Sequence, residues 1–251
     1  PTESGQVDYK NWRAVSVENV VLGRLLPSDG GRLKLSIELL DVVRGESLMT
    51  AEIAMPNPAR WRSVAHQAAD RIFEKLTGVR GVFDTQIAYV TASGTGRKRL
   101  FQVLVSDADG ANPVTVSSSR EPLLSPSWSP DRRKLAYVGF ERSHSAIFIH
   151  TLATGELRKL VSEKGINGAP AWSPDGRTLA VTMSFESNPD IYLIDSESGA
   201  RKRLTEHFAI DTEPSWSPDG KEIAFTSDRG GQPQIYAVSS SGGAARRLTY
   251  E

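Results

Sequence analysis

The sequence predicts a mainly β protein, a β-propeller preceded by a small α/β domain. Three observations carry this prediction: a motif that recurs every 44 residues, four short apolar segments inside each recurrence, and a separate strand-and-helix pattern ahead of the first one. A length of 251 residues is enough for one large or two ordinary domains. We expect residues 1–82 to form the α/β domain and residues 83–251 to form the propeller repeats.

Tryptophan marks the repeat. Trp128, Trp172 and Trp216 lie 44 residues apart, and each is followed by Ser-Pro-Asp. A more divergent copy precedes them at 86–116, which makes four repeats. A unit of roughly 40–45 residues with four strands is typical of a propeller blade.

Each unit is expected to hold four strands, which we name a to d in chain order. In the second unit they are 124–129, 134–140, 146–151 and 157–161, separated by Gly, Pro, Asp and Ser. The tryptophan is expected to pack between neighbouring blades, and the aspartate to be locked in the tight turn that Ser-Pro-Asp favours. These structural repeat residues are Trp128, Asp131, Trp172, Asp175, Trp216 and Asp219.

The phase of the repeat leaves the first blade incomplete. The chain begins the repeats at strand b, at 86–91, and finishes them in the strand d that precedes Glu251. Three blades are therefore expected to be whole, and one to lack strand a. Since native proteins avoid an unpaired strand edge, we expect the C-terminal blades to be missing from this sequence.

Residues 1–82 contain patterns for three strands and one helix. The strands are expected at 19–27, 33–43 and 49–55. The helix is expected at 60–78, where apolar residues follow one helical face and Gly78 suits a C-terminal cap. Because so few elements make a thin core, this domain is expected to be incomplete or to lean on the propeller.

Basic doublets recur in register in the expected d strands, at 158–159, 202–203 and 246–247. Lys and Arg on an outermost strand discourage edge-to-edge pairing and keep their charges in water. We therefore expect these doublets to be solvated.

Charge and hydropathy exclude several classes of partner. Thirty Lys and Arg balance thirty Asp and Glu, which argues against binding nucleic acid through charge. The sequence has no apolar run of the ~18 residues that a spanning helix needs, and its polar start shows no signal-like segment. We expect a protein that binds no nucleic acid and does not span a membrane.

Patterns for catalysis and metal binding are weak. The sequence has no Cys, and none of its four His residues stands at a paired ligand spacing. It also lacks the G-x-S-x-G elbow of many serine hydrolases. The segment 107–110 resembles the start of a calcium loop but lacks the closing Glu, so a hairpin turn is expected there. We expect no catalytic residue, no metal and no cofactor.

Recognition is expected on the propeller face that the d–a and b–c loops share. The d–a loops are expected at 118–126, 162–170 and 206–214, and they differ between repeats more than the strands do. Their mixture of apolar and acidic side chains suits a protein partner better than a sugar cleft. The residues concerned are Leu123, Leu124, Ile166, Ile210 and Asp211.

Several segments resemble one known family. The helix-to-blade junction at 73–91, VLVSDADG at 103–110 and INGAPAWSPDGRTLA at 166–180 are similar to the TolB family, the periplasmic propeller components of Tol-Pal cell-envelope systems. The resemblance implies a six-bladed propeller in the intact protein, behind a small α/β domain. It also implies a periplasmic location reached with a cleaved signal, and a role without catalysis.

The resemblance also implies partners. Family members bind the lipoprotein Pal through the propeller face, and TolA through an N-terminal segment without a counterpart here. Some colicins compete with Pal, and outer-membrane proteins are further candidates. The family's role in outer-membrane integrity and in envelope constriction at cell division is implied as well. The Pal-contacting positions that carry over are Ile166, Asn167, Gly168, Ala169, Thr212 and Glu213.

Other functions stay open on the sequence alone. The repeats also occur in the gating propellers of prolyl-oligopeptidase-like serine peptidases, whose catalytic domain would be absent here. A sugar-processing propeller is a further alternative, which aromatic residues lining the channel would indicate. The d–a loops are also compatible with no binding role at all.

Overall fold

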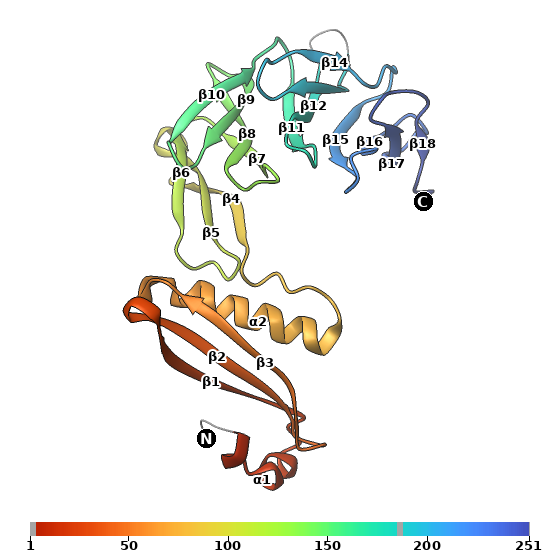
Figure 1. The fold of residues 1–251 in the computed structure, drawn as a ribbon. Coiled ribbons are helices and arrows are strands. Elements are labelled where there is room, and N and C mark those ends of the chain that lie inside the picture. The colour runs from red at the N-terminus through yellow and green to blue at the C-terminus, as the bar shows by residue number, and fades with distance from the viewer. Residues whose placement is uncertain (1–3, 185–187, 251) are drawn as a thin grey trace. The chain divides into compact units, whose positions relative to one another are not determined.

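The computed structural model describes residues 4–184 and 188–250 (Figure 1). Internal contacts divide the chain into two units. One unit is Pro1–Ile87 with Asp107–Asn112, and the other is Ala88–Ser106 with Pro113–Glu251. The domain boundary expected between residues 82 and 83 stays a prediction.

The first unit contains an antiparallel sheet of three strands in the order β1-β2-β3. The strands are β1 (Asn19–Ser28), β2 (Arg32–Asp41) and β3 (Glu46–Met55). Strand β3 therefore begins at Glu46 rather than at 49. Gly30 has a φ of 71° in the turn between β1 and β2, a conformation that glycine adopts at little cost.

Helix α2 (Trp61–Thr77) covers one face of this sheet (Figure 1). Its Val64 and Ala68 are buried against Ile37 and Ile53 of the sheet, which forms the core of the unit. The helix ends at Gly78, whose φ of 72° and N–H bond to the Glu74 carbonyl form a left-handed cap.

A short helix, α1 (Tyr9–Ala14), was not expected from the sequence. The Asp8 carboxylate accepts hydrogen bonds from the N–H groups of Lys10 and Asn11 at 3.1 and 3.2 Å, which caps its first turn. Before it, Val7 is buried with Leu22 and Leu40 of the sheet. Short 3₁₀ turns complete the elements of the chain: Ser4–Gln6, Asp29–Gly31, Pro58–Arg60 and Gly96–Lys98.

The hairpin turn at Asp107–Asn112 belongs to the first unit. Its Asp109 carboxylate pairs with Arg62 and lies 3.3 Å from Nε2 of His66, both on α2. The Asp107 carboxylate accepts a bond of 2.8 Å from the Asn112 amide. The segment that resembles a calcium loop is thus a hairpin turn held by side-chain bonds, as expected.

The second unit contains the blades, each an antiparallel meander. Among the described residues, the first sheet has three strands and the next three sheets have four, which confirms the expected propeller architecture. In chain order the strands are β4 (Gln86–Ser93), β5 (Leu100–Asp107), β6 (Val114–Ser119), β7 (Leu123–Trp128), β8 (Lys134–Glu141), β9 (His144–Thr151), β10 (Glu156–Val161), β11 (Asn167–Trp172), β12 (Thr178–Met183), β13 (Asp190–Asp195), β14 (Arg201–Arg203), β15 (Asp211–Trp216), β16 (Glu222–Ser227), β17 (Gln234–Ser239) and β18 (Arg246–Arg247).

The core of this unit lies between blades. Trp172, on β11, packs with Ile147 and Val161 of the preceding blade and with Leu179 and Tyr192 of its own. Trp128 and Trp216 border the corresponding clusters on either side. The indole N–H of Trp216 donates to the carbonyl of Ala171, 3.1 Å away in the preceding blade. The tryptophan in each strand a therefore joins neighbouring sheets.

The basic doublets differ from the expectation that they are simply solvated. Arg158 donates to the carbonyls of Ser196 and Glu197 in the c–d turn of the next blade. Lys202 does the same to the Ser241 carbonyl of the following blade, at 3.0 Å. Turn carbonyls lack a strand partner, so these long side chains reach across the seam and tie the outer edges of the blades together.

A strained residue in the a–b turn predicts a stabilising substitution. Arg132 has a φ of 60° where the next two blades have Gly176 and Gly220, both with a φ of 71°. The left-handed conformation costs a non-glycine residue about 1–2 kcal/mol, part of which glycine loses again through the entropy of its unfolded state. Arg132→Gly should therefore raise the free energy of unfolding by about 0.5–1 kcal/mol in urea titration. Gly176→Ala is the matched control and should lower it, and a lower midpoint for Arg132→Gly would contradict this account.

Candidate functional site

The predicted contact residues lie mostly in strands, so the expected loop boundaries are wrong. Strand β7 begins at Leu123, β11 at Asn167 and β15 at Asp211. The d–a loops are consequently shorter than 118–126, 162–170 and 206–214. Of the ten predicted residues, only Ile166 and Ile210 lie in loops.

A β-bulge explains why strand a extends further than expected. The pairing register of β7, β11 and β15 shifts just before a proline in each blade. Ser125, Ala169 and Glu213 precede these prolines with φ values of 48°, 46° and 53°. A bulge accommodates the missing proline N–H and turns the strand. Three left-handed residues therefore recur at the same end of neighbouring blades.

A pocket of about 340 Å³ opens at this end of the blades. Leu124, Val138 and Phe140 line it from one blade, Ile166 from the next, and Glu213 from the one after. Six of the ten predicted residues contribute to its lining: Leu124, Ile166, Asn167, Gly168, Ala169 and Glu213. The other four do not: Leu123, Ile210, Asp211 and Thr212.

The apolar wall of the pocket includes residues that sequence reasoning missed. Val138 and Phe140 belong to β8, a segment expected from the sequence only to be strand b of its blade. The signal that could have found Phe140 is its place at the end of strand b, because the b–c connection shares the face of the d–a loops. The lining combines these apolar side chains with three serines, Asn167 and one carboxylate, that of Glu213. The apolar wall makes the pocket suitable for an apolar side chain of a partner, and the polar groups can fix its orientation.

The first residue of strand a is buried in every complete blade. Leu123, Asn167 and Asp211 occupy this position with exposures of 3%, 0% and 0%. The Asn167 amide donates to the carbonyls of Glu163 and Ser145 at 2.7 and 3.0 Å, and its oxygen accepts from the Glu163 N–H at 3.1 Å. These side chains support the d–a loops from inside the blades. Because the side chains are buried, a partner cannot reach them.

A second group of buried charges lies beside the pocket. The Asp211 carboxylate pairs with Arg229 at 2.7 Å, and the Asp190 carboxylate pairs with Arg203. Burial raises the pKa of Asp190, and the nearby Asp211 raises it further, although bonding to Arg203 opposes both effects. Asp190 also accepts from the hydroxyl of Thr205 at 3.3 Å. Asp190 thereby holds the beginning of the last d–a connection through Thr205 and the His207 N–H, and Arg229 of the following b–c connection pairs with the first residue of β15.

The exposed residues of the predicted set are Leu124, Ile166, Ile210 and Glu213, and Gly168, Ala169 and Thr212 are half-buried. The three exposed apolar side chains, those of Leu124, Ile166 and Ile210, expose 46%, 48% and 49% of their surface. In residues 4–184 and 188–250, no group of three or more His, Cys, Asp or Glu side chains is arranged to hold a metal ion. Within the same residues no helix has the length and apolar character needed to cross a bilayer.

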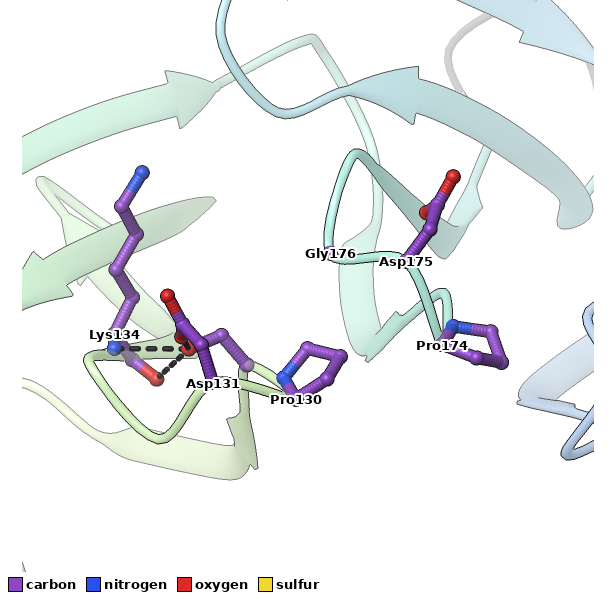
Figure 2. A pocket seen from close by; sticks show the side chains of 7 residues that line it. Pro130, Asp131, Lys134, Pro174, Asp175 and Gly176 are labelled. Atoms are coloured by element: carbon purple, nitrogen blue, oxygen red, sulfur yellow. Dashed lines mark hydrogen bonds between the residues drawn. The ribbon is translucent and has the colours of Figure 1, made fainter.

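A second hollow, of about 370 Å³, lies between the Ser-Pro-Asp turns of two blades (Figure 2). Figure 2 shows Pro130 and Asp131 on one turn, and Pro174 and Asp175 on the other. Each aspartate accepts a bond of 2.6 Å from the serine hydroxyl of its own turn and one of 3.0 Å from a backbone N–H. These polar groups are satisfied within their turns, which makes this hollow a weaker candidate site than the pocket at the opposite end.

The turn aspartates have lowered pKa values. The Ser173 hydroxyl, with the Arg177 N–H, lowers the pKa of Asp175, and the corresponding groups lower those of Asp131 and Asp219. Hydrogen bonds to the ionised form are the cause, and they recur because the turn recurs.

Fold and site together define a class: a propeller joined to an N-terminal α/β unit, with a pocket at the loop end of its blades. The model of the TolB beta propeller domain matches residues 73–251, and that of the TolB amino-terminal domain matches residues 1–48. This chain belongs to the TolB family.

Individual relatives agree with this assignment. The chain is 50% identical over 170 residues to the Tol-Pal system protein TolB of Xanthomonas campestris pv. campestris, a match covering 67% of the chain and 38% of that relative. The crystal structure of TolB from Acinetobacter baumannii is 40% identical with a TM-score of 0.89, covering 98% of the chain and 61% of that structure. A puromycin hydrolase, at 13% identity and a TM-score of 0.54, shares the fold alone. That match covers 90% of this chain and 38% of the hydrolase chain. The fold class and the family resemblance are thereby confirmed.

The buried position of Asn167 predicts a structural effect of its removal. Asn167→Ala leaves the Glu163 N–H and the carbonyls of Glu163 and Ser145 without their bonds, which should cost about 2 kcal/mol or more of unfolding free energy. Ile166→Ala, at an exposed neighbour, should stay within about 0.5 kcal/mol. Chemical denaturation of both variants measures the difference, and equal stabilities would refute the anchoring role.

The turn aspartates predict a dependence of stability on acid. Because their pKa values are lowered on folding, their contribution is complete above the ordinary value of 3.8 and is lost as the pH falls through the lowered values. The triple variant Asp131→Asn, Asp175→Asn, Asp219→Asn keeps an acceptor in each turn but cannot titrate. Thermal melts between about pH 7 and pH 3 should show a shallower loss of Tm for this variant. A loss as steep as in the unaltered protein would show that these groups do not carry the effect.

Proposed function

We propose that this protein is a non-catalytic, periplasmic component of a Tol-Pal system that binds the lipoprotein Pal through the pocket end of its propeller. Membership of the TolB family supports a role in such a system. The relatives that it matches are longer than this chain, since the matched region is 38% of their length. The activity of the whole protein is therefore part of the proposal.

The observation that carries the proposal is the convergence of accessible side chains on one pocket. Leu124 and Ile166 come from two blades and Glu213 from a third, yet they line one cavity with Val138 and Phe140. An apolar centre with a polar border is the usual composition of the central part of a protein interface. A partner with an apolar side chain and a nearby hydrogen-bond donor would fit.

The site is also rigid before any partner arrives. Asn167 fastens the loop at one side, and Asp211 is fastened by Arg229 at the other. The bulges hold Ala169 and Glu213 in a left-handed conformation that the surrounding sheet enforces. Because little ordering remains to be done, more of the contact energy is available for affinity.

Further partners are proposed on the same basis. TolA contact through an N-terminal segment of the intact protein, and competition by colicins or outer-membrane proteins for the pocket, would place the protein between the two membranes. Through these contacts it would contribute to outer-membrane integrity and to constriction of the envelope during division. Binding and release of Pal at the pocket would be its central step.

A charged substitution next to the pocket tests the proposal. Thr212, half-buried on β15 beside Glu213, is replaced by arginine, and binding to purified Pal of the same organism is measured by calorimetry. We expect Thr212→Arg to weaken the affinity at least about tenfold, because a bulky charge then occupies the interface.

Thr154→Arg is the matched control, since Thr154 is an exposed residue of a c–d turn at the opposite end of the blade. It should leave the affinity unchanged. Unaltered Pal binding by Thr212→Arg, with its fold intact by circular dichroism, would disprove the proposed interface.

A further inference from the structure

One aromatic side chain projects from a connection in which several neighbouring residues are buried. The d–a segment that precedes β15 contains Phe208, which is 86% exposed. Its neighbours in this segment, Leu204, Thr205 and Ala209, are 8%, 6% and 5% exposed. The projection of Phe208 therefore comes from a rigid segment and not from a loose one.

The peptide groups on both sides of Phe208 are hydrogen-bonded. The Asn188 amide donates to the carbonyl of His207 at 2.8 Å and to the carbonyl of Ala209. The N–H of Ala209 donates to Nδ1 of the His207 ring at 3.0 Å, and the N–H of His207 lies 3.4 Å from the Asp190 carboxylate. The backbone conformation at Phe208 is thus set by side chains of the blade.

The bond from the His207 N–H is made to a buried carboxylate, that of Asp190, which has other partners in the same blade. Asp190 is fully buried, pairs with Arg203 and accepts from the Thr205 hydroxyl, which in turn accepts from the N–H of Ile191 at 3.0 Å. The His207 ring also lies 4.2 Å from the Phe208 ring, centroid to centroid. Little backbone freedom remains to be lost when Phe208 meets a surface.

Phe208 is continuous with the proposed interface. The chain runs from Phe208 through Ile210, which is 49% exposed, to Glu213 in the pocket lining. The Glu213 carboxylate has no hydrogen-bond or ion-pair partner in the described part of the chain. Apolar and acidic groups thus stand side by side on this edge of the face.

We infer that Phe208 is an anchor that enters an apolar hollow of the bound Pal, and that Asn188 is the residue that positions it. The inference rests on the proposed function and adds the chemistry of the partner surface: an apolar hollow bordered by a basic or N–H-bearing group that meets Glu213. Large, preorganised aromatic side chains are the residues that most often dominate binding energy. Phe208 is thereby a determinant of affinity in addition to the pocket.

Truncation of the ring tests the anchor. Phe208→Ala should weaken calorimetric binding to Pal by about 30-fold or more, the loss expected of a hot-spot residue. Val114→Ala, at a 62% exposed residue at the other end of a blade, is the control and should not change it. An affinity of Phe208→Ala within twofold of the unaltered protein would overturn the inference.

A double-mutant cycle tests the positioning role. Asn188→Ala should weaken Pal binding when Phe208 is present and should add little further loss to Phe208→Ala, because its effect passes through the same ring. Additive losses would overturn this role. Thermal melts of each variant show whether a loss of Pal affinity comes from the interface or from a damaged fold. A general structural defect lowers Tm, and it leaves the affinity losses of the two substitutions additive.

The two proposals fail in distinguishable ways. If Thr212→Arg abolishes Pal binding and Phe208→Ala does not affect it, the anchor is refuted and the Pal interface stands. If the unaltered protein does not bind Pal, both are refuted. If sedimentation shows that Phe208→Ala dissolves a self-associated form without affecting Pal binding, the occupant is a second copy and the inference is overturned.

Discussion

The burial of each blade against the next is the constraint on which the propeller unit depends. A single four-stranded sheet has two apolar faces, and only neighbouring sheets can cover them. Trp172 illustrates this, since it packs with Ile147 of the preceding blade as well as Leu179 of its own. Arg158 strengthens the same seam at the outer edge by reaching the next c–d turn. A repeat of fixed length follows, because every blade must present the same surfaces in the same register.

The same constraint determines where a partner can bind. In a sheet that has a neighbour on each side, both faces are buried and the accessible surface is concentrated at the strand ends. At one end of the blades lie the Ser-Pro-Asp turns, whose polar groups are hydrogen-bonded within the turn. At the other end lie the bulges at Ser125, Ala169 and Glu213, where the pocket is found. Buried side chains such as Asn167 hold the connections there, and exposed ones such as Ile166 remain free for contact. Rigidity and recognition thus arise from adjacent residues where the d–a loop meets strand a.

Much of the fold could be predicted from the sequence, because the same residue types recur at the same positions of each blade. The spacing of the tryptophans and the Ser-Pro-Asp turns predicted the blades, and the apolar periodicity together with Gly78 predicted helix α2. Helix α1 was missed, since a cap by Asp8 is its main support and no apolar pattern accompanies it. In the site, Ile166 and Glu213 could be predicted from position, whereas Phe140 was missed although its place at the end of strand b points to the same face. The burial of the expected loop residues and the backbone conformation at Phe208 depend on hydrogen bonds between segments that are far apart in the sequence. The spacing of residues along the sequence does not reveal such bonds.

The central claim is that a partner of the Tol-Pal system binds at the bulged ends of the blades. Hydrogen–deuterium exchange of the protein with and without Pal tests it most directly, because it maps contact along the whole chain without a substitution. The account predicts slowed exchange at the beginnings of β7, β11 and β15 and in the connection before β15, with no change in the Ser-Pro-Asp turns. Protection confined to those turns, or to the three-stranded sheet β1–β3, would contradict it.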